Sequence, residues 1–146
     1  MKVKSHAEVE KVRRSVSEWR RLSDRLFSVG PFGVGLDGLL TWVPVVGGVY
    51  GLGVGGFLLA QATRVRASRA TMVKMGLLMG ADALVGEIPL VGDAFDFLFR
   101  AHARSARILL KEMEQTHYAV GDVPLAHHEA QIRASPGKRR LVVLDA

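Results

Sequence analysis

The chain has 146 residues, which is enough for one domain and a tail. It contains no Cys, so disulfides, thiolate nucleophiles and cysteine-ligated metal centres are excluded. Hydrophobic residues make up 49% of the sequence, and 20 Lys and Arg against 14 Asp and Glu give a net charge of +6. This composition excludes a disordered polyelectrolyte and leaves both a soluble domain and a membrane protein open.

Basic and apolar residues are segregated along the chain. Residues 1–28 carry eight basic and four acidic side chains, and residues 29–62 carry a single charge. Residues 63–74 carry four basic side chains and no acid, whereas residues 75–99 carry four acids and no base. Two glycine-rich apolar blocks therefore lie between basic blocks, which is typical of proteins whose basic flanks meet lipid headgroups.

The first predicted element is an amphipathic basic helix within residues 1–28. Apolar residues recur there every three or four positions, as in a helix with one apolar stripe. The stripe consists of Val9, Val12, Val16, Trp19, Leu22 and Leu26, and the opposite side carries Arg13, Arg14, Arg20 and Arg21. Two interpretations are open: the stripe packs on the rest of the domain, or it enters a membrane while the arginines contact phosphates.

The second predicted element is an uncharged segment at residues 43–62. It is long enough for one spanning helix, at a rise of about 1.5 Å per residue across a hydrocarbon layer of about 30 Å. Glycines spaced four apart suggest faces for close helix packing in lipid. They are Gly47, Gly51 and Gly55, and then Gly76 and Gly80.

A long helix is predicted from Pro89 to Glu114, where apolar and charged residues separate onto two sides. We expect residues 115–146 to form a flexible polar tail, because they contain Gly and Pro with little periodicity. Residues 141–144 are consistent with a short strand or with a docking segment. The predicted domains are thus residues 1–28, a helical membrane-associated domain over 29–114, and the tail.

An internal repeat is the clearest signal in the sequence. Residues 35–47 align without a gap on residues 80–92, and both copies fit G-x-D-x-L-Φ-x-x-Φ-P-Φ-V-G, where Φ is apolar. Proline disfavours the helical conformation in the residue before it and suits the first turn of a new helix. Each copy is therefore predicted to be a helix, a Pro/Gly break and a second helix, with the two units at about 35–62 and 80–110. The break residues are Pro44, Gly47, Pro89 and Gly92.

Four carboxylates accompany the repeat: Asp37, Asp82, Glu87 and Asp93. One interpretation is that each repeat Asp caps the helix that follows the break. The other is that these groups converge on a proton or a cation. A charged side chain is costly at the centre of a membrane, so the acids of the second unit make a simple lipid-facing transmembrane helix there implausible. We therefore expect re-entrant or half-inserted hairpins that keep all basic blocks on one side of the membrane.

No catalytic or cofactor motif accompanies these elements. Two G-x-G-x-x-G matches fall in one glycine-rich block without the expected strand, and no phosphate-binding loop, nucleophile elbow or H-E-x-x-H is present. The histidines lack spaced partners for a metal, and the basic charge comes without a nucleic-acid-binding fold motif or aromatic platform. We therefore expect a non-enzyme with no cofactor, no metal and no nucleic-acid partner.

The repeat resembles domain of unknown function family 4112. The resemblance rests on Asp37 with the following Val-Pro-Val-Val-Gly, on Asp82 with the following Glu-Ile-Pro-Leu-Val-Gly-Asp, and on the basic linker, and it covers roughly residues 20–112. It implies helices and a microbial membrane, and it implies no activity. In the family the first copy usually ends in Val-Gly-Asp, whereas Gly48 stands at that Asp position here.

The sequence thus predicts an all-α protein of two helical hairpins preceded by the basic helix. We expect a non-enzymatic packing, scaffolding or interaction role in a membrane, the bacterial inner membrane, with self-association through the glycine faces. The basic segments would lie on the cytoplasmic side and contact anionic headgroups through Arg13, Arg14, Arg20, Arg21, Arg64, Arg66 and Arg69. Two alternatives stay open, a transporter-like protein that handles a cation or proton with the four carboxylates, and a soluble helical module that binds acidic partners.

Overall fold

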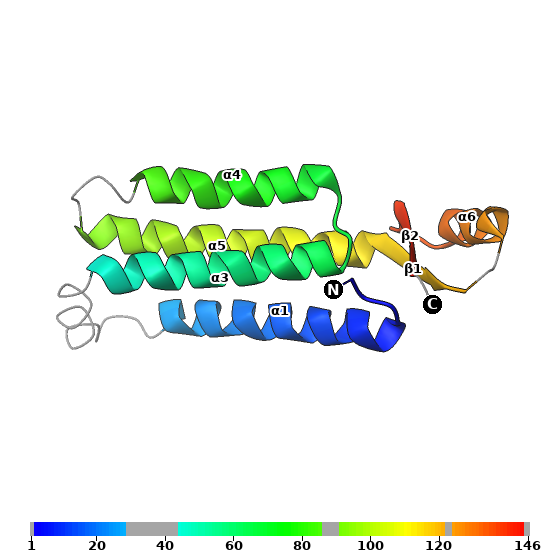
Figure 1. The fold of residues 1–146 in the computed structure, drawn as a ribbon, viewed down its shortest axis with the longest axis horizontal. Helices are drawn as coiled ribbons and strands as arrows, with labels where there is room; N and C mark the ends of the chain where they lie inside the picture. Colours follow the sequence, from blue (N-terminus) through cyan, green and yellow to red (C-terminus); the bar gives the residue numbers. More distant parts are fainter. Residues whose placement is uncertain (1, 29–43, 86–90, 122–123, 145–146) are drawn as a thin grey trace.

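A computed structural model describes residues 2–28, 44–85, 91–121 and 124–144. Within these ranges the protein is mostly helical, as the sequence predicts. Four long helices lie side by side and form a bundle, and a small strand–helix–strand module lies at one end of it (Figure 1). The bundle helices are α1 (His6–Ser28), α3 (Pro44–Arg64), α4 (Arg69–Val85) and α5 (Val91–Gln115). The module contains β1 (Thr116–Val120), α6 (Leu125–Ala134) and β2 (Arg140–Leu144).

Helix α5 is the centre of the bundle, because it contacts α1, α3 and α4. Its buried positions include small residues such as Ala103 and Ala106, which let neighbouring helices approach closely, and the fully buried Leu109. The core cluster joins this side of α5 to Leu58 of α3 and Met75 of α4. The predicted long helix is therefore present and carries most of the packing.

The apolar stripe of helix α1 packs against the rest of the bundle. Val9, Val12 and Val16 are buried in the core cluster and Trp19 packs against it, whereas Leu22 is half-exposed. The stripe thus follows the first of the two interpretations, packing on the rest of the domain. Ser5 caps the start of this helix, because its Oγ accepts a hydrogen bond from the Glu8 N–H at 3.3 Å.

The prediction of an all-α chain is wrong at the C-terminal end. Strands β1 and β2 pair in parallel, with the register running from Thr116↔Arg140 to Val120↔Leu144. Helix α6 connects them, as a parallel pair requires a crossover. Residues 115–146, which we expected to be a flexible tail, thus contain regular elements, and Val142 and Leu144 are buried. Of the two interpretations of residues 141–144, the short strand is confirmed, because these residues lie in β2.

Only part of the predicted repeat lies within the described residues. Helix α3 begins at Pro44, as predicted, because proline suits the first turn of a helix. Helix α4 ends at Val85 and α5 begins at Val91, which leaves Pro89 outside the described residues. Gly47 and Gly92 lie in helices α3 and α5, close to the start of each. The mostly helical class is therefore established, while the duplicated hairpin stays a prediction.

No helix in the described ranges is both long enough and apolar enough to cross a bilayer. Helix α3 has about the length predicted for residues 43–62. The expectation that this segment is a transmembrane helix is not supported.

Two matched substitutions test this assignment of the core. Leu109→Ala is expected to lower the free energy of unfolding by about 2–5 kcal/mol, because Leu109 is 0% exposed and the change leaves a cavity. Leu52→Ala is expected to change it by less than about 0.5 kcal/mol, because Leu52 is 77% exposed. Urea denaturation of both variants measures the difference, and equal costs would contradict the packing described above.

Candidate interaction surface

The outward sides of α3 and α4 expose large apolar side chains. Leu52 on α3 is 77% exposed, and Val73 and Leu77 on α4 are 58% and 68% exposed. Small residues of the same two helices are exposed as well: Gly53, Gly56 and Ala60 on α3, and Ala70, Gly76 and Gly80 on α4. The two helices are neighbours in the bundle. We call these nine residues the α3–α4 outer face.

This face exists because the apolar residues of α3 and α4 are not confined to one side of either helix. Helices α1 and α5 separate apolar from polar residues, so each has a side suited to water, whereas α3 has no charged residue before Arg64. A helix that is apolar all round is normally buried on all sides. Here α5 and the neighbouring helices cover one side of α3 and of α4. The other side is left without an apolar partner in the described part of the chain.

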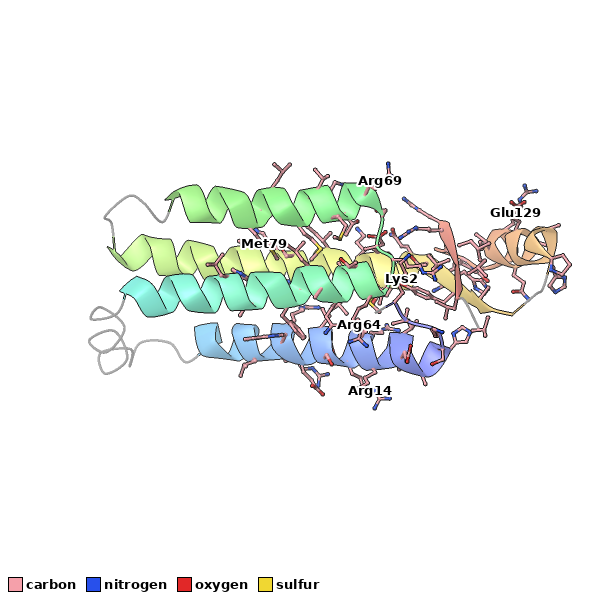
Figure 2. The ribbon with its side chains drawn as sticks, in the orientation of Figure 1. Lys2, Arg14, Arg64, Arg69, Met79 and Glu129 are labelled. Atoms are coloured by element: carbon pink, nitrogen blue, oxygen red, sulfur yellow. The ribbon has the colours of Figure 1, made fainter. Side chains whose placement is uncertain are left out.

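The predicted packing glycines fall into two groups. At Gly55, an added Cβ would lie 3.3 Å from Met79 Sδ and 3.4 Å from His102 Nε2, so this glycine lets α3 approach α4 and α5 closely. Figure 2 shows Met79 in this region of the bundle. At Gly76 and Gly80 an added Cβ would meet nothing within 4 Å. In contrast to Gly55, these two glycines meet no neighbour within the described part of the chain. The surroundings of Gly47 and Gly51 lie outside the description.

The arginines that were predicted to contact lipid headgroups differ in their exposure. Arg14, Arg21 and Arg69 are exposed, and Figure 2 shows Arg14 pointing away from the bundle. Arg13 is exposed and lies 3.4 Å from Glu114, Arg20 is partly buried, and Arg64 donates to Gln61 Oε1 at 3.3 Å.

Arg66 departs from the expectation, because its guanidinium is used inside the chain. It donates to the Val143 carbonyl at 2.8 Å, and its backbone has a φ of 53°, in the left-handed region. The Arg140 guanidinium in turn donates to the Arg66 carbonyl. The two arginines thus tie the α3–α4 turn to β2.

A polar cluster that the sequence analysis missed holds the same end of the bundle together. Glu112 Oε1 accepts hydrogen bonds from the Ser68 N–H at 2.6 Å and from Arg140 Nη1 at 2.7 Å. Tyr118 donates its hydroxyl to the Val65 carbonyl at 3.4 Å. These pairs are separated by 28 to 53 positions, so no local spacing in the sequence signals them.

Burial and charge shift two pKa values in this cluster. Burial alone would raise the pKa of Glu112, but hydrogen bonds from Thr71 and Ser68 and the positive charge of Arg140 outweigh it and lower the pKa from 4.5. Burial raises the pKa of the Tyr118 hydroxyl to about 12, although Arg140 opposes this shift. The cluster therefore contains an ionised Glu112 and a neutral Tyr118 at neutral pH, which suits a structural role.

The candidate ion-handling carboxylates are not brought together by any described contact. Asp37 and Glu87 lie outside the described residues, and the side chains of Asp82 in α4 and Asp93 in α5 also lie outside the description. Among the described residues no group of three or more metal-ligating side chains occurs. The ion-handling role of these carboxylates stays a prediction.

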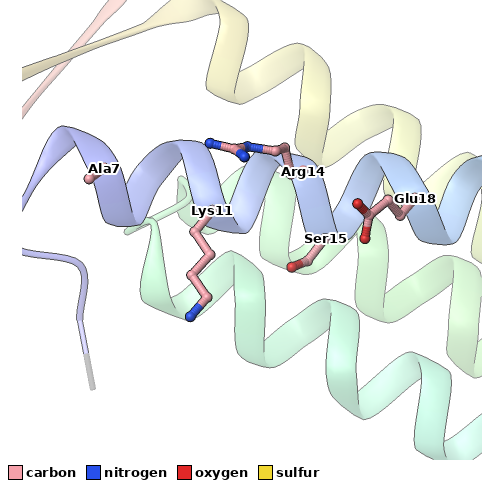
Figure 3. A pocket seen from close by; sticks show the side chains of 5 residues that line it. All are labelled: Ala7, Lys11, Arg14, Ser15 and Glu18. Carbon is pink, nitrogen blue, oxygen red and sulfur yellow. The ribbon is translucent and has the colours of Figure 1, made fainter.

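Two open clefts lie along α1. The larger, of about 420 Å³, is lined by α1 residues that include Lys11, Ser15 and Glu18, along the side of the helix shown in Figure 3. The second, of about 360 Å³, lies between α1, the end of α5 and β1. Neither cleft has an enclosed apolar pocket with a few convergent polar groups, which is the usual form of a small-molecule site.

The comparison with known families agrees with the resemblance seen in the repeat. The family model described as Domain of unknown function (DUF4112) matches residues 12–113. The chain belongs to this family. The matched region begins within α1 and ends within α5, so the DUF4112 domain comprises the four-helix bundle with the α3–α4 outer face, and β1, α6 and β2 follow it. No curated protein and no solved structure matches the chain.

Glycine substitutions distinguish the close contact from the open face. Gly53→Ala and Gly56→Ala are each expected to raise the free energy of unfolding by up to about 1 kcal/mol, because Ala favours the helix and an added Cβ meets nothing within 4 Å. Gly55→Leu is expected to lower it by about 1–3 kcal/mol by overpacking against Met79 and His102. Thermal and urea unfolding measure both effects, and a stabilising Gly55→Leu would show that α3, α4 and α5 are not closely packed there.

The Glu112 cluster predicts a specific dependence on pH. Because its pKa is lower in the folded chain, Glu112 stabilises the fold above the unfolded-state pKa of about 4.5, and this stabilisation is lost as the pH falls through the lower folded-state pKa. Glu112→Gln should reduce the free energy of unfolding by about 1.5–3 kcal/mol at neutral pH. It should also flatten the loss of stability below about pH 4.5, as measured by urea denaturation across the acid range. A variant with the same acid dependence as the unsubstituted chain would assign that loss to other groups.

Proposed function

We propose that this protein is a non-enzymatic, membrane-associated packing protein whose α3–α4 outer face lies in the acyl-chain region of a bilayer. The proposal rests above all on the exposure of Leu52, Val73 and Leu77 on helices whose apolar residues are not confined to one side. Full burial of such a side chain is worth about 1.5–3 kcal/mol. Three of them, with the small residues around them, supply enough free energy to hold the face in lipid.

The distribution of charge supports a membrane more than a protein partner. Two exposed cations lie on α4: Arg69 begins the helix next to the α3–α4 turn, as Figure 2 shows, and Lys74 lies five positions further along. The nine residues of the α3–α4 outer face carry no charge themselves, and Lys74 lies between Val73 and Leu77 along α4. A face that is apolar along most of its length and cationic at one end matches acyl chains beside anionic headgroups, where each Lys or Arg is worth about 1 kcal/mol.

In this arrangement the face lies in the bilayer without crossing it. Re-entrant or half-inserted hairpins, one from each copy of the repeat, would keep every basic segment on the same side, which for a bacterial inner membrane is the cytoplasmic side. The basic helix α1 would remain packed on the bundle, with Arg14 and Arg21 toward water or headgroups. Self-association through exposed small residues such as Gly76 and Gly80 would then bring copies together within the membrane.

Vesicle flotation tests the apolar face directly. The unsubstituted chain should float with phosphatidylcholine vesicles that contain phosphatidylglycerol, and Leu52→Gln with Leu77→Gln should reduce the bound fraction by at least about tenfold, because two exposed leucines no longer enter the acyl chains. Leu22→Gln is the control, because Leu22 is also an exposed leucine, at 50%, but lies on α1. A loss of flotation only in Leu22→Gln would place the membrane contact on α1, and absence of flotation in the unsubstituted chain would contradict the proposal.

The cationic end gives a second, separable prediction. Arg69→Gln and Lys74→Gln should each weaken binding to anionic vesicles by about fivefold, which corresponds to about 1 kcal/mol per cation near the surface. Binding to purely zwitterionic vesicles should be unchanged. Arg13→Gln serves as a control on α1, and an equal loss in that variant would point to general electrostatic attraction instead of an oriented face.

A further inference from the structure

The small sheet at the end of the bundle leaves one strand edge open. In the described chain the sheet contains only β1 and β2, so β1 has β2 on one edge and no strand on the other. Parallel sheets are usually larger and covered, which makes a two-stranded parallel sheet an incomplete unit. An open edge carries N–H and C=O groups that are available for pairing.

Backbone groups alternate in direction along a strand, so every second residue of β1 directs its N–H and C=O away from β2. At the start of β1, the Thr116 carbonyl accepts a hydrogen bond from a side chain, Lys138 Nζ, at 3.2 Å.

A cleft of about 360 Å³ runs along this open edge. Three consecutive residues of β1, Thr116, His117 and Tyr118, line it, although neighbouring residues of a strand point to opposite faces of a sheet. A cleft that reaches all three therefore lies beside the strand and not over one face. The opposite wall comes from the first turns of α1 and the last turns of α5, with Val9 of α1 and Met113 of α5 as apolar contacts.

The charged groups of the cleft indicate the chemistry of its occupant. Basic side chains reach it from α1, from β1 and from the turn before β2, and they are His6, Arg13, His117 and Lys138. Glu10 is the one carboxylate among the described residues that line it. Arg13 has an exposed contact of 3.4 Å with Glu114, and such surface pairs are weak and easily exchanged.

We propose that β1 binds an extended acidic peptide segment as a third strand of the sheet. Its backbone pairs with the open edge of β1, its carboxylates lie near Arg13 and Lys138, and its apolar side chains contact Val9 and Met113. Main-chain pairing supplies affinity in this mode and the side-chain contacts supply selectivity. This site is independent of the α3–α4 outer face and does not rest on the membrane proposal.

Designed peptide probes test the proposal on the full chain. Ac-Val-Glu-Val-Glu-Val-NH2 should bind, with amide shift changes in an NMR spectrum concentrated in β1 and at the start of α1. The matched probe Ac-Val-Lys-Val-Lys-Val-NH2 should bind at least about tenfold more weakly, because Lys faces the cationic wall. A third probe, the acidic peptide with alternate amides N-methylated, should lose binding, since it keeps the charges but lacks donors for strand pairing.

Variants of the chain complete the test. Arg13→Gln should weaken the acidic probe severalfold while leaving the fold intact, because its ion pair is exposed. Binding that survives N-methylation, equal binding of the lysine probe, or no binding of the acidic probe would each overturn the proposal. Dimerisation of the unsubstituted chain that is lost in Val120→Pro, without probe binding, would assign the edge to a second copy of the chain instead.

Discussion

The structure depends on an imbalance between how apolar α3 and α4 are and how much of them the chain can cover. In both helices the apolar residues lie on more than one side, yet α5 and the adjacent helices bury only one side of each. A bundle in which every helix carried a polar outer side would have no such face. The exposure of Leu52 and Leu77 follows directly from this imbalance. The proposed place of the protein in a membrane is the arrangement that supplies the missing apolar environment.

The opposite end of the molecule is organised by polar contacts. Glu112 joins the α3–α4 turn to β2 through Ser68 and Arg140, and the two arginines Arg66 and Arg140 each donate to a backbone carbonyl on the other's segment. These bonds fix the turn that carries the cationic residues and, through β2, the open edge of β1. The apolar face, the cationic end and the strand edge are therefore positioned by one bundle centred on α5, although the two proposed contacts differ in chemistry.

Local sequence patterns predicted the parts of the fold that depend on local periodicity. The three- and four-residue spacing identified α1 and α5 within a few residues of their observed bounds, and Pro44 marked the start of α3. The sheet was missed because β1 and β2 have five residues each and pair across a crossover, so neither has a detectable period. Arg66 was assigned to headgroups because its partner, the Val143 carbonyl, lies 77 positions away. The sequence does not show which of the predicted packing glycines lie in close contacts. The structure shows that an added Cβ would meet Met79 and His102 at Gly55 and nothing within 4 Å at Gly76.

The central claim is that lipid covers the α3–α4 outer face, and the depth of a single labelled residue tests it most directly. Because the chain contains no Cys, Leu77→Cys provides one attachment site for an environment-sensitive fluorophore, and Arg14→Cys provides the same site on the far side of α1. With vesicles of brominated lipid, the account predicts a blue-shifted and quenched emission at position 77 and an unquenched one at position 14. Emission from position 77 that stays as red and unquenched as it is without lipid would contradict the account.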